Sequence, residues 1–283
     1  MVVLVSGAAG QLGQAIKSRA EFFSDFNFVF CTSAELNITN LENCKAVFAK
    51  YQPAFCINTA AYTAVDKAES EPELAEAINV LGAENLAKAS KEHNTVLLHV
   101  STDFVFDGSA KTPYKETDAP NPQSVYGATK LKGEQAIASN WEKHFIVRTS
   151  WVFSEFGNNF KKTMLRLASD RDELSVVADQ IGTPTQALDL ANVLLQMCDL
   201  QVKHTPKNYG IYHFSNLGEC SWFDFAKEIF KQNNVTIKLN PIPTSAYPTP
   251  AKRPAYSVMD KTKIQQVFGV EIKSWENVIV NKD

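Results

Sequence analysis

Tyr126 and Lys130 lie four residues apart and are of the types that acid–base chemistry uses. If the segment is helical, this spacing places both side chains on one face, one turn apart. A neighbouring ammonium group favours the phenolate and lowers the pKa of a tyrosine from its ordinary value of about 10. No other tyrosine of the chain is followed by a lysine four residues later. Chance alone would often supply one such pair, so the interpretation depends on what the rest of the chain adds.

Three evenly spaced glycines, Gly7, Gly10 and Gly13, follow an apolar segment at the N-terminus. Glycine permits a tight turn and lets backbone N–H groups at the start of a helix approach a pyrophosphate. The GxxGxxG spacing differs from the GxGxxG of the best-known dinucleotide fingerprint, and a plain turn is the alternative. Because residues 2–6 are expected to form the first strand of an alternating β/α chain, we predict that this loop binds a nucleotide.

Two hydroxyl residues, Thr32 and Ser33, come at the end of the second expected strand. In dinucleotide-binding folds an acid at this position binds the ribose 2′-hydroxyl and excludes a 2′-phosphate. No acid precedes Glu35, and no lysine or arginine stands there to demand the phosphate. We therefore predict NADPH as the cofactor, with NADH as the alternative.

Small and hydroxyl residues follow two further expected strands. Residues 58–62, which read Asn-Thr-Ala-Ala-Tyr, follow the third strand and would let the chain pass close to a cofactor; a simple strand exit is the alternative. Thr102 and Asp103 follow the fourth strand, where a hydroxyl could orient a substrate carbonyl towards Tyr126; a helix cap or Asx turn is the alternative. Since the carboxyl ends of parallel strands meet at one edge of a sheet, these groups predict a single hydride-transfer site.

Short apolar runs alternate with helix-like segments through the first half of the chain. This alternation predicts an α/β fold: a doubly wound, Rossmann-like parallel sheet with a smaller C-terminal substrate-binding region. We expect a dinucleotide-binding domain at 1–150, to which segments of about 186–215 return, and a substrate-binding region at 151–185 and 216–283. The expected strands are 2–6, 28–31, 55–58, 96–100, 145–148 and 211–215. The expected helices are 11–22, 41–51, 72–92, one around Tyr126, 158–169, 187–198, and 222–230 behind a Ser221 cap. The proline-rich stretch 241–254 is expected to form an ordered loop.

The composition is that of a globular protein, with 45% hydrophobic and 21% charged residues and a formal net charge of −3. This charge argues against a nucleic-acid or anionic-membrane surface. The N-terminal apolar run is too short for a membrane span and lacks a basic flank, so neither an anchor nor a signal peptide is expected. The five cysteines are scattered, which predicts reduced thiols, no zinc site and a cytoplasmic location.

Several stretches resemble the extended short-chain dehydrogenase/reductase family, in the family's order and over nearly the whole chain. They are Gly7-x-x-Gly10-Gln11-Leu12-Gly13, 58–69, 101–108, Tyr126-x-x-x-Lys130, 148–152, 179–185 and Arg253-Pro254. Within the family the resemblance is to the branch that completes dTDP-rhamnose synthesis. It implies reduction of the 4-keto group of a dTDP-6-deoxy-hexulose by NAD(P)H, with a nucleotide sugar as the substrate.

The same resemblance implies a role for each site residue. Tyr126 would donate the proton, Lys130 would lower the Tyr126 pKa and hold the nicotinamide ribose, and Thr102 would position the carbonyl. The implied cofactor contacts are Gly7, Gly10, Gln11, Leu12 and Gly13 at the pyrophosphate, with Ala60, Ala61, Tyr62 and Asn79 along the rest of the cleft. The implied substrate contacts are Thr102, Asp103, Trp151, Gln180, Thr183 and Arg253. Core packing is the alternative for Trp151, and a surface position is the alternative for Arg253, which could otherwise clamp a diphosphate.

Metal binding and oligomeric state follow less directly from the resemblance. Some bacterial members dimerise through a metal held by acids, one of them just after the glycine loop, where this chain has Gln14 and Ala15. We therefore expect no metal ligands, and both a role for Mg²⁺ and a homodimer are left open.

Two other functions remain as alternatives. A related nucleotide-sugar dehydratase or epimerase is the first, although dehydration would need Asp-Glu where this chain has Asp103-Phe104. A non-catalytic NADP-binding regulatory subunit, resembling that of methionine adenosyltransferase, is the second. The complete set of Tyr126, Lys130 and Thr102 argues against the second alternative.

Overall fold

A six-stranded parallel sheet organises the chain, of which the computed structural model describes residues 1–204 and 208–280. The strand order is β2-β1-β3-β4-β5-β10, and all neighbours are parallel. The winding reverses between β1 and β3, which is where doubly wound sheets bind ligands. The predicted doubly wound α/β fold is confirmed. The strands are β1 Val2–Ser6, β2 Asn27–Cys31, β3 Phe55–Asn58, β4 Val96–Thr102, β5 His144–Thr149 and β10 Gly210–His213.

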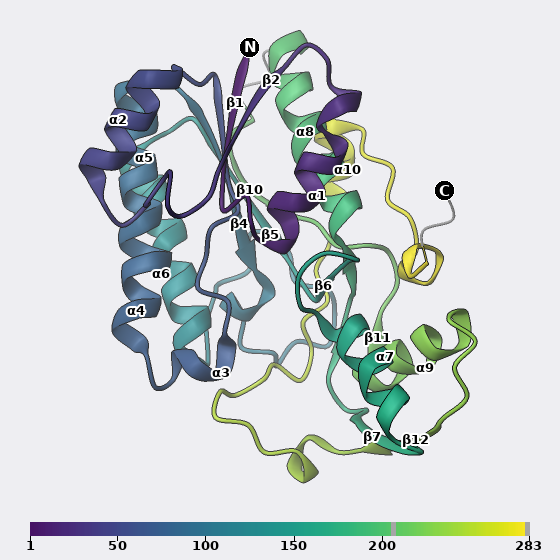
Figure 1. The fold of residues 1–283 in the computed structure, drawn as a ribbon. Coiled ribbons are helices and arrows are strands. Elements are labelled where there is room, and N and C mark those ends of the chain that lie inside the picture. Colours follow the sequence, from purple (N-terminus) through teal and green to yellow (C-terminus); the bar gives the residue numbers. More distant parts are fainter. Residues whose placement is uncertain (205–207, 281–283) are drawn as a thin grey trace.

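Helices cover both faces of the sheet (Figure 1). Leu4 and Val5 of β1 point to opposite faces and both are fully buried, as expected for a central strand of a parallel sheet. One face carries α2 Leu41–Tyr51, α5 Gly82–Glu92 and α6 Val125–Asn140, and the other carries α1 Gln11–Arg19, α8 Ala187–His204 and α10 Thr262–Phe268. Shorter elements are the 3-10 turns η1 Ala20–Phe22 and η3 Asp103–Val105 and the helix α3 Val65–Ala68.

The helix expected over 72–92 is interrupted by a π-helical turn. It consists of α4 Pro72–Glu76, the π turn Ala77–Leu81, and α5. Such turns insert a residue into a helix and are frequent at functional sites. Here the turn carries Asn79, whose side chain bonds the backbone N–H and carbonyl of Tyr62 at 2.9 and 3.2 Å and the Thr129 hydroxyl at 3.1 Å. Asn79 therefore fastens the segment after β3 to α6.

The C-terminal region has its own core, to which Phe153, Phe225 and Trp275 contribute. Its strands pair as β6 Val152–Phe153 with β9 Thr185–Gln186, β7 Glu173–Val177 with β12 Lys238–Ile242, and β8 Ile181–Gly182 with β11 Cys220–Ser221. Its helices are α7 Phe160–Asp170 and α9 Trp222–Gln232, with 3-10 turns η4 Thr244–Ala246 and η5 Trp275–Val278. Ser221 caps α9 in a capping box with Asp224, as predicted.

Two segments differ from their predictions. Helix α10 lies in the substrate-binding region by sequence, yet Ile264 and Phe268 pack into the core of the central sheet. The proline-rich stretch begins in a strand rather than a loop, because Pro241 lies within β12. A two-stranded sheet has only edges, where a residue without an N–H is tolerated. The division of the chain into domains stays a prediction.

Candidate active site

Tyr126 and Lys130 lie one turn apart on α6, as their spacing predicted. Ser124 caps this helix, since its Oγ accepts a hydrogen bond from the Gly127 N–H at 3.2 Å. A Cβ atom on Gly127 would lie 2.2 Å from the carbonyl oxygen of Phe104. The glycine therefore allows the start of α6 to lie directly against the chain that leaves β4.

Thr102 ends β4, and Asp103 begins the 3-10 turn that follows it. Thr102 Oγ1 accepts from the Phe104 N–H at 3.2 Å and donates to Asp103 Oδ1 at 3.0 Å. The cap that was the alternative interpretation of Thr102 is thus present. The Thr102 side chain also acts on the Tyr126 phenol, whose pKa it lowers. The two interpretations of Thr102 are therefore compatible, because the hydroxyl that caps the 3-10 turn also affects the phenol.

The Tyr126 phenol is a weaker acid in this structure than the sequence suggested. Burial raises the pKa of Tyr126 to about 12; the hydrogen bond with Thr102 opposes this shift, and the charge of Asp103 adds to it. The expected lowering of this pKa by Lys130 is not found. Desolvation is the largest cause of the shift, and the other groups that move the pKa of the phenol, Thr102 and Asp103, lie at the end of β4. Tyr126 is consequently protonated at neutral pH and can act as a donor.

Lys130 is 2% exposed, and both polar contacts of its Nζ are with residues of β4. The Nζ donates to the carbonyl oxygen of Val100 at 2.7 Å and lies 3.1 Å from His99 Nε2. Burial lowers the pKa of Lys130 to about 8, and the nearby carboxylate of Glu134 opposes this shift. An ammonium with so few partners is costly to bury, so the protonation state of Lys130 depends on what His99 offers it.

Asp103 is the buried acid of the site. It is 2% exposed, and its Oδ2 has no hydrogen-bond partner within the described chain. Burial raises the pKa of Asp103 to about 6, against hydrogen bonds from Ser257 and Thr102 that favour the charged form. A buried carboxylate oxygen without a partner is destabilising, and a substrate hydroxyl could satisfy it.

A buried ion pair beneath α6 was not predicted. Glu134 receives Arg148 Nε at 3.0 Å and Arg148 NH2 at 2.6 Å, and it accepts from the Ser101 hydroxyl at 2.5 Å. Glu134 follows Lys130 by four residues, so Tyr126, Lys130 and Glu134 form one stripe along α6. That repeated spacing was the available signal. The pair ties the helix to both β4 and β5.

The glycine loop joins β1 to α1 where the strand order reverses. Gly7 has a φ of 71°, and a Cβ there would lie 2.6 Å from the backbone nitrogen of Ala60. Glycine is required for this close approach of two strand exits. Helix α1 begins behind Gly10 with no side-chain cap and no acid in its first turn. Free N–H groups at a helix N-terminus suit a pyrophosphate, so this loop fits a dinucleotide at the predicted residues Gly7, Gly10, Gln11, Leu12 and Gly13.

An acid, Glu35, lies at the exit of β2. It comes four residues after the strand ends, but its side chain folds back onto Thr32. The backbone N–H and hydroxyl of Thr32 donate to Glu35 Oε2 at 2.7 and 2.9 Å, and these bonds lower the pKa of Glu35. Ser33 is exposed beside them. A carboxylate near the adenine ribose favours a 2′-hydroxyl over a 2′-phosphate, so this contact weakens the argument for NADPH that was drawn from Thr32 and Ser33.

The remaining predicted cofactor residues lie beside the glycine loop. Ala60 and Ala61 are partly exposed, and the Ala60 N–H donates to Asn58 Oδ1 at 3.1 Å. The Tyr62 hydroxyl donates to Glu71 at 2.5 Å. With the Asn79 amide bonded to the Tyr62 backbone, these contacts shape the segment after β3, and the small alanines are the part that stays accessible.

Trp151 follows β5 in an unusual conformation. Its φ is 47°, which is strained for a bulky residue. Its ring stacks on Trp222 with centroids 3.5 Å apart and planes 10° apart. A Cβ on Gly182 would lie 2.6 Å from Trp151 Cε2, so the glycine makes room for the ring. The packing alternative is thus realised, and substrate contact by Trp151 stays a prediction.

Gln180 and Thr183 are less available than predicted. Thr183 is fully buried, and its hydroxyl donates to the Gly218 carbonyl oxygen at 2.8 Å. The Thr183 side chain therefore does not face a substrate in this structure. Gln180 is 7% exposed and donates to Thr244 Oγ1 at 3.0 Å. Both residues position the segments around them.

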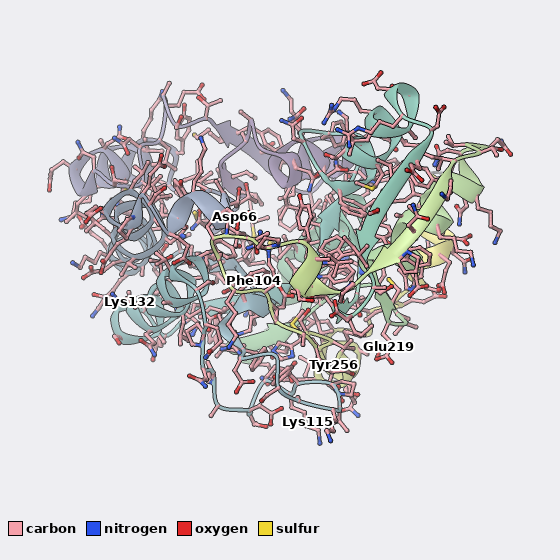
Figure 2. The ribbon with its side chains drawn as sticks, turned by 90° about the horizontal axis from the view of Figure 1, so that it is seen from below. Asp66, Phe104, Lys115, Lys132, Glu219 and Tyr256 are labelled. Atoms are coloured by element: carbon pink, nitrogen blue, oxygen red, sulfur yellow. The ribbon has the colours of Figure 1, made fainter. Side chains whose placement is uncertain are left out.

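Arg253 reaches the site from the proline-rich segment. Its NH2 donates to Asp66 Oδ2 at 2.7 Å, and its guanidinium lies 5.9 Å from the ring centre of Phe104. Phe104 in turn meets Tyr126 edge to face, with ring centroids 5.5 Å apart. Figure 2 labels Asp66 and Phe104 beside the yellow-green segment that carries this arginine. Phe104 thus contacts both the guanidinium and the Tyr126 ring, and the guanidinium is already paired with Asp66.

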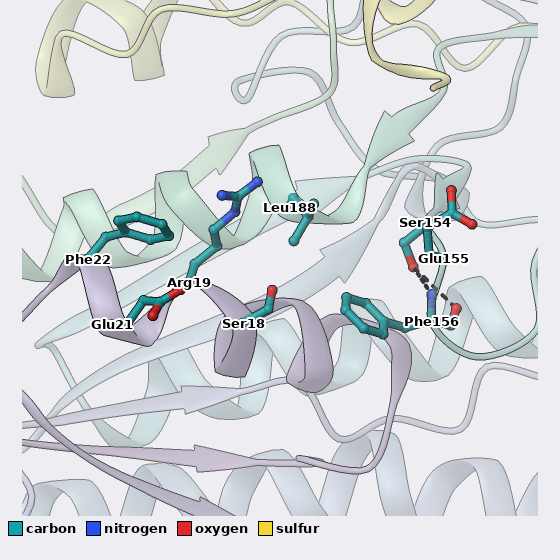
Figure 3. A pocket seen from close by; sticks show the side chains of 8 residues that line it. All are labelled: Ser18, Arg19, Glu21, Phe22, Ser154, Glu155, Phe156 and Leu188. Atoms are coloured by element: carbon teal, nitrogen blue, oxygen red, sulfur yellow. Dashed lines mark hydrogen bonds between the residues drawn. The ribbon is translucent and has the colours of Figure 1, made fainter. Parts of the chain in front are cut away.

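A hollow of about 440 Å³ lies elsewhere on the molecule (Figure 3). Its lining side chains come from the end of α1, the turn η1, the turn after β6 and the start of α8, and they include none of the predicted site residues. They are Ser18, Arg19, Glu21, Phe22, Ser154, Glu155, Phe156 and Leu188. Across the described ranges, no helix is both long enough and apolar enough to cross a membrane.

The chain matches known proteins over nearly its full length. The family described as RmlD substrate binding domain matches residues 1–281. A curated dTDP-4-dehydrorhamnose reductase of Aggregatibacter actinomycetemcomitans is 45% identical, over 99% of this chain and 97% of that protein.

Solved structures give the same result. The crystal structure of a dTDP-4-dehydrorhamnose reductase from Clostridium acetobutylicum superposes with a TM-score of 0.93 at 42% identity, over 99% of this chain and 97% of that one. The Bacillus anthracis dTDP-4-dehydrorhamnose reductase in complex with NADP gives 0.92 at 40% identity, over 98% and 96% of the two chains.

Proposed function

Since this chain belongs to the RmlD family, and relatives at 41–45% identity are dTDP-4-dehydrorhamnose reductases, we infer that it reduces dTDP-4-dehydro-L-rhamnose to dTDP-L-rhamnose. The reaction is the NAD(P)H-dependent reduction of the sugar 4-keto group. The family predicted from the sequence is confirmed. The chain is an oxidoreductase of nucleotide-sugar biosynthesis.

Tyr126 is the proposed proton donor. A bound reduced nicotinamide supplies the hydride to the carbonyl carbon of the sugar. As negative charge develops on the carbonyl oxygen, the phenol of Tyr126 gives that oxygen its proton. When the sugar binds, the Thr102 hydroxyl would turn away from Asp103 Oδ1, to which it donates at 3.0 Å, and donate to the same substrate oxygen, which orients it. The observation that carries this assignment is the packing of the start of α6 against the chain that leaves β4, where the Tyr126 ring meets Phe104 with centroids 5.5 Å apart, two residues after Thr102.

The glycine loop is the proposed site for the cofactor diphosphate, with Ala60, Ala61 and Tyr62 beside it and Lys130 at the nicotinamide ribose. NADPH is the proposed cofactor because a structural relative binds NADP. NADH is retained as an alternative because the Glu35 carboxylate accepts hydrogen bonds from Thr32. Arg253 and the unpartnered oxygen of Asp103 are the proposed contacts of the nucleotide-sugar substrate.

We also propose a cellular location for the protein. All five cysteines are free and buried, which supports a cytoplasmic location with reduced thiols. A homodimer and a role for Mg²⁺ are retained as alternatives, with no ligand set proposed for a metal.

The assignment is tested by following NADPH and NADH oxidation with dTDP-4-dehydrorhamnose and with its UDP counterpart, each with and without magnesium. We expect one cofactor oxidised per sugar reduced, and faster turnover of the dTDP sugar. Isomerised sugar without net oxidation of the cofactor would instead identify an epimerase. Cofactor binding without any turnover, together with copurification of a synthetase, would identify a regulatory subunit.

A further inference from the structure

A chain of buried polar groups runs from β1 to Lys130. The Ser6 hydroxyl donates to Asn58 Oδ1 at 2.7 Å, Asn58 Nδ2 lies 2.9 Å from His99 Nδ1, and His99 Nε2 lies 3.1 Å from Lys130 Nζ. Ser6, Asn58 and His99 are at most 1% exposed, and Lys130 is 2% exposed. Their hydrogens are therefore fixed by one another, and the donors and acceptors can be counted along the chain.

The orientation of the Asn58 amide is the first step of that count. The backbone N–H of Ala60 points at Asn58 Oδ1 at 3.1 Å and can only donate. The atom that faces Ala60 must therefore be the carbonyl oxygen, because an NH₂ group there would set two donors against each other. Asn58 consequently presents its NH₂ group to His99 Nδ1.

The tautomer of His99 follows from that orientation. Because Asn58 donates to Nδ1, this nitrogen carries the lone pair and no proton. Burial is the largest cause that lowers the pKa of His99, and it takes this pKa well below its ordinary value, so the ring is neutral. The single ring proton is then on Nε2, the nitrogen that faces Lys130.

Lys130 Nζ must accept a hydrogen bond from His99 Nε2–H. Of its two protonation states, the ammonium and the neutral amine, only one can accept. An ammonium has three donors and no lone pair, so it cannot accept from Nε2–H. A neutral amine accepts from His99 with its lone pair and still donates to the Val100 carbonyl oxygen, 2.7 Å away. Every donor from Ser6 to Lys130 therefore faces an acceptor only if Lys130 is neutral.

We propose that His99 is a positioning residue that donates Nε2–H to Lys130 and holds it as a neutral amine, so that Lys130 takes up a proton when it engages the cofactor. This inference rests on the proposed function for the second half, the engagement of a cofactor. The first half, the tautomer of His99, stands on the contacts of the chain alone.

The charges around Lys130 act in both directions. On α6, the Glu134 carboxylate favours the ammonium, while burial favours the amine and lowers the pKa of Lys130 to about 8. Glu134 is itself neutralised by Arg148 of β5, at 2.6 Å. From β4, the Nε2–H of His99 also favours the amine. From β5, His144 adds no charge at ordinary pH, because burial lowers its pKa.

Two other buried histidines serve as internal references for the tautomer. His144 Nδ1 lies 2.6 Å from the Trp141 carbonyl oxygen, and His213 Nδ1 lies 3.1 Å from the Tyr114 carbonyl oxygen. A carbonyl only accepts, so both rings carry their proton on Nδ1. His99 is expected to be the odd one among the three.

The test is a long-range ¹H–¹⁵N spectrum of protein labelled in its histidine rings, recorded without nucleotide and assigned with a His99→Gln variant. We expect the Nε2–H pattern for His99 and the Nδ1–H pattern for His144 and His213. An Nδ1–H or doubly protonated His99 would overturn the proposal, whether or not the protein reduces a sugar. The tautomers are read from the wild-type protein, and the His99→Gln variant serves only to assign the His99 signals.

An Asn58→Asp variant replaces the group that donates to His99 Nδ1 with a group that accepts from it. The aspartate can accept from Ser6, Ala60 and His99 Nδ1–H together, so His99 should switch to the Nδ1–H tautomer and Lys130 to the ammonium. Ser6→Ala is the matched control, because it removes a neighbouring hydroxyl but keeps the Asn58 amide that donates to His99. It should leave the Nε2–H pattern in place. A His99 tautomer unchanged in folded Asn58→Asp protein would contradict the proposal.

Calorimetry tests the uptake of the proton. The enthalpy of NADPH binding is measured in buffers of different ionisation enthalpy at about pH 8, well above the second phosphate pKa of about 6. Burial alone brings the pKa of Lys130 to about 8, and the Nε2–H of His99 favours the amine further. Wild-type protein should therefore take up about half a proton or more per bound NADPH, and Asn58→Asp protein close to none. Binding without uptake in the wild type would overturn the proposal. Failure to bind NADPH at all would instead contradict the proposed function, and the tautomer result would remain.

Discussion

The two sides of the candidate site differ in what holds their side chains. On the cofactor side, His99, Lys130 and Arg148 are at most 2% exposed, and each is bonded to a neighbour within the sheet or α6. On the substrate side, the paired side chains of Arg253 and Asp66 are 21% and 41% exposed. The groups that handle protons are therefore fixed by the fold, whereas Arg253 must exchange its protein partner Asp66 for the sugar nucleotide.

The largest effect is expected on the fixed side, from Tyr126→Phe. The ring keeps its contact with Phe104, but the proton donor is lost, so kcat should fall by about 10²- to 10⁴-fold while the Kd for NADPH stays unchanged. Steady-state kinetics and a fluorescence titration with NADPH measure the two quantities.

The matched control is Tyr256→Phe, since the Tyr256 hydroxyl donates to Glu219 Oε2 at 3.1 Å on the exposed side of the molecule, where Figure 2 labels both residues. Turnover by this control should stay near that of the wild type. Nearly normal kcat in Tyr126→Phe would mean that another group supplies the proton.

The next largest effect is expected on stability, from Arg148→Met. This change leaves the Glu134 carboxylate buried without its cation, which should lower the free energy of unfolding by about 3–5 kcal/mol. Adding Glu134→Leu removes the stranded charge and should recover most of the loss. Urea unfolding of both variants measures the difference, and equal instability of the single and double variants would show that packing, not charge, is responsible.

A control for this pair lies on the outer side of the same helix. Lys132 bonds Glu76 at 3.0 Å with both side chains 54% exposed, and Figure 2 labels Lys132 at the surface. Removing such an exposed pair by Lys132→Ala should change stability by only about 0–1 kcal/mol. The contrast between the two ion pairs isolates burial as the cause.

What the sequence could predict follows the same division. Residues whose role depends on a repeating pattern were found: the strand and helix bounds at 55–58 and 41–51, and the stripe that begins at Tyr126 and Lys130. Period and spacing are local properties, so a single sequence contains them. The exit of each parallel strand is also local, which is why Gly7 and Thr102 could be placed at one edge of the sheet.

Contacts between distant segments could not be predicted in this way. Arg253 and Asp66 are 187 residues apart, and no spacing rule joins an arginine in a proline-rich loop to one acid among many. The polar partners of Lys130 were missed for a related reason. A histidine such as His99 in an apolar strand reads as core, and only the packed structure shows which of its nitrogens meets which neighbour.

Asp103 gives a smaller effect, and one that depends on pH. Burial raises its folded-state pKa from 3.8 to about 6, so between these values the folded protein holds more protons than the unfolded chain, and stability falls as pH rises. Above about pH 6, Asp103→Asn should therefore be more stable than the wild type by about 3 kcal/mol, and the gain should vanish near pH 4.

The same variant should lose activity, because the unpartnered Asp103 oxygen is a proposed substrate contact. Thermal unfolding across this pH range and steady-state kinetics measure the two effects. Stability curves of variant and wild type that run parallel with pH would show that Asp103 is charged in the folded protein throughout.

The smallest effects belong to the substrate side and separate two roles of Arg253. Arg253→Gln removes a cation that would bind the sugar-nucleotide diphosphate, so the KM for the sugar nucleotide should rise about tenfold or more while NADPH affinity is kept. Asp66→Asn removes the competing partner, which holds the guanidinium at 2.7 Å. Because a half-exposed ion pair is worth about 0.2–1 kcal/mol, this second change should lower the KM by about one- to fivefold. If Asp66→Asn instead raises the KM as much as Arg253→Gln does, the ion pair itself forms the substrate-side wall, and both sides of the site are fixed by the fold.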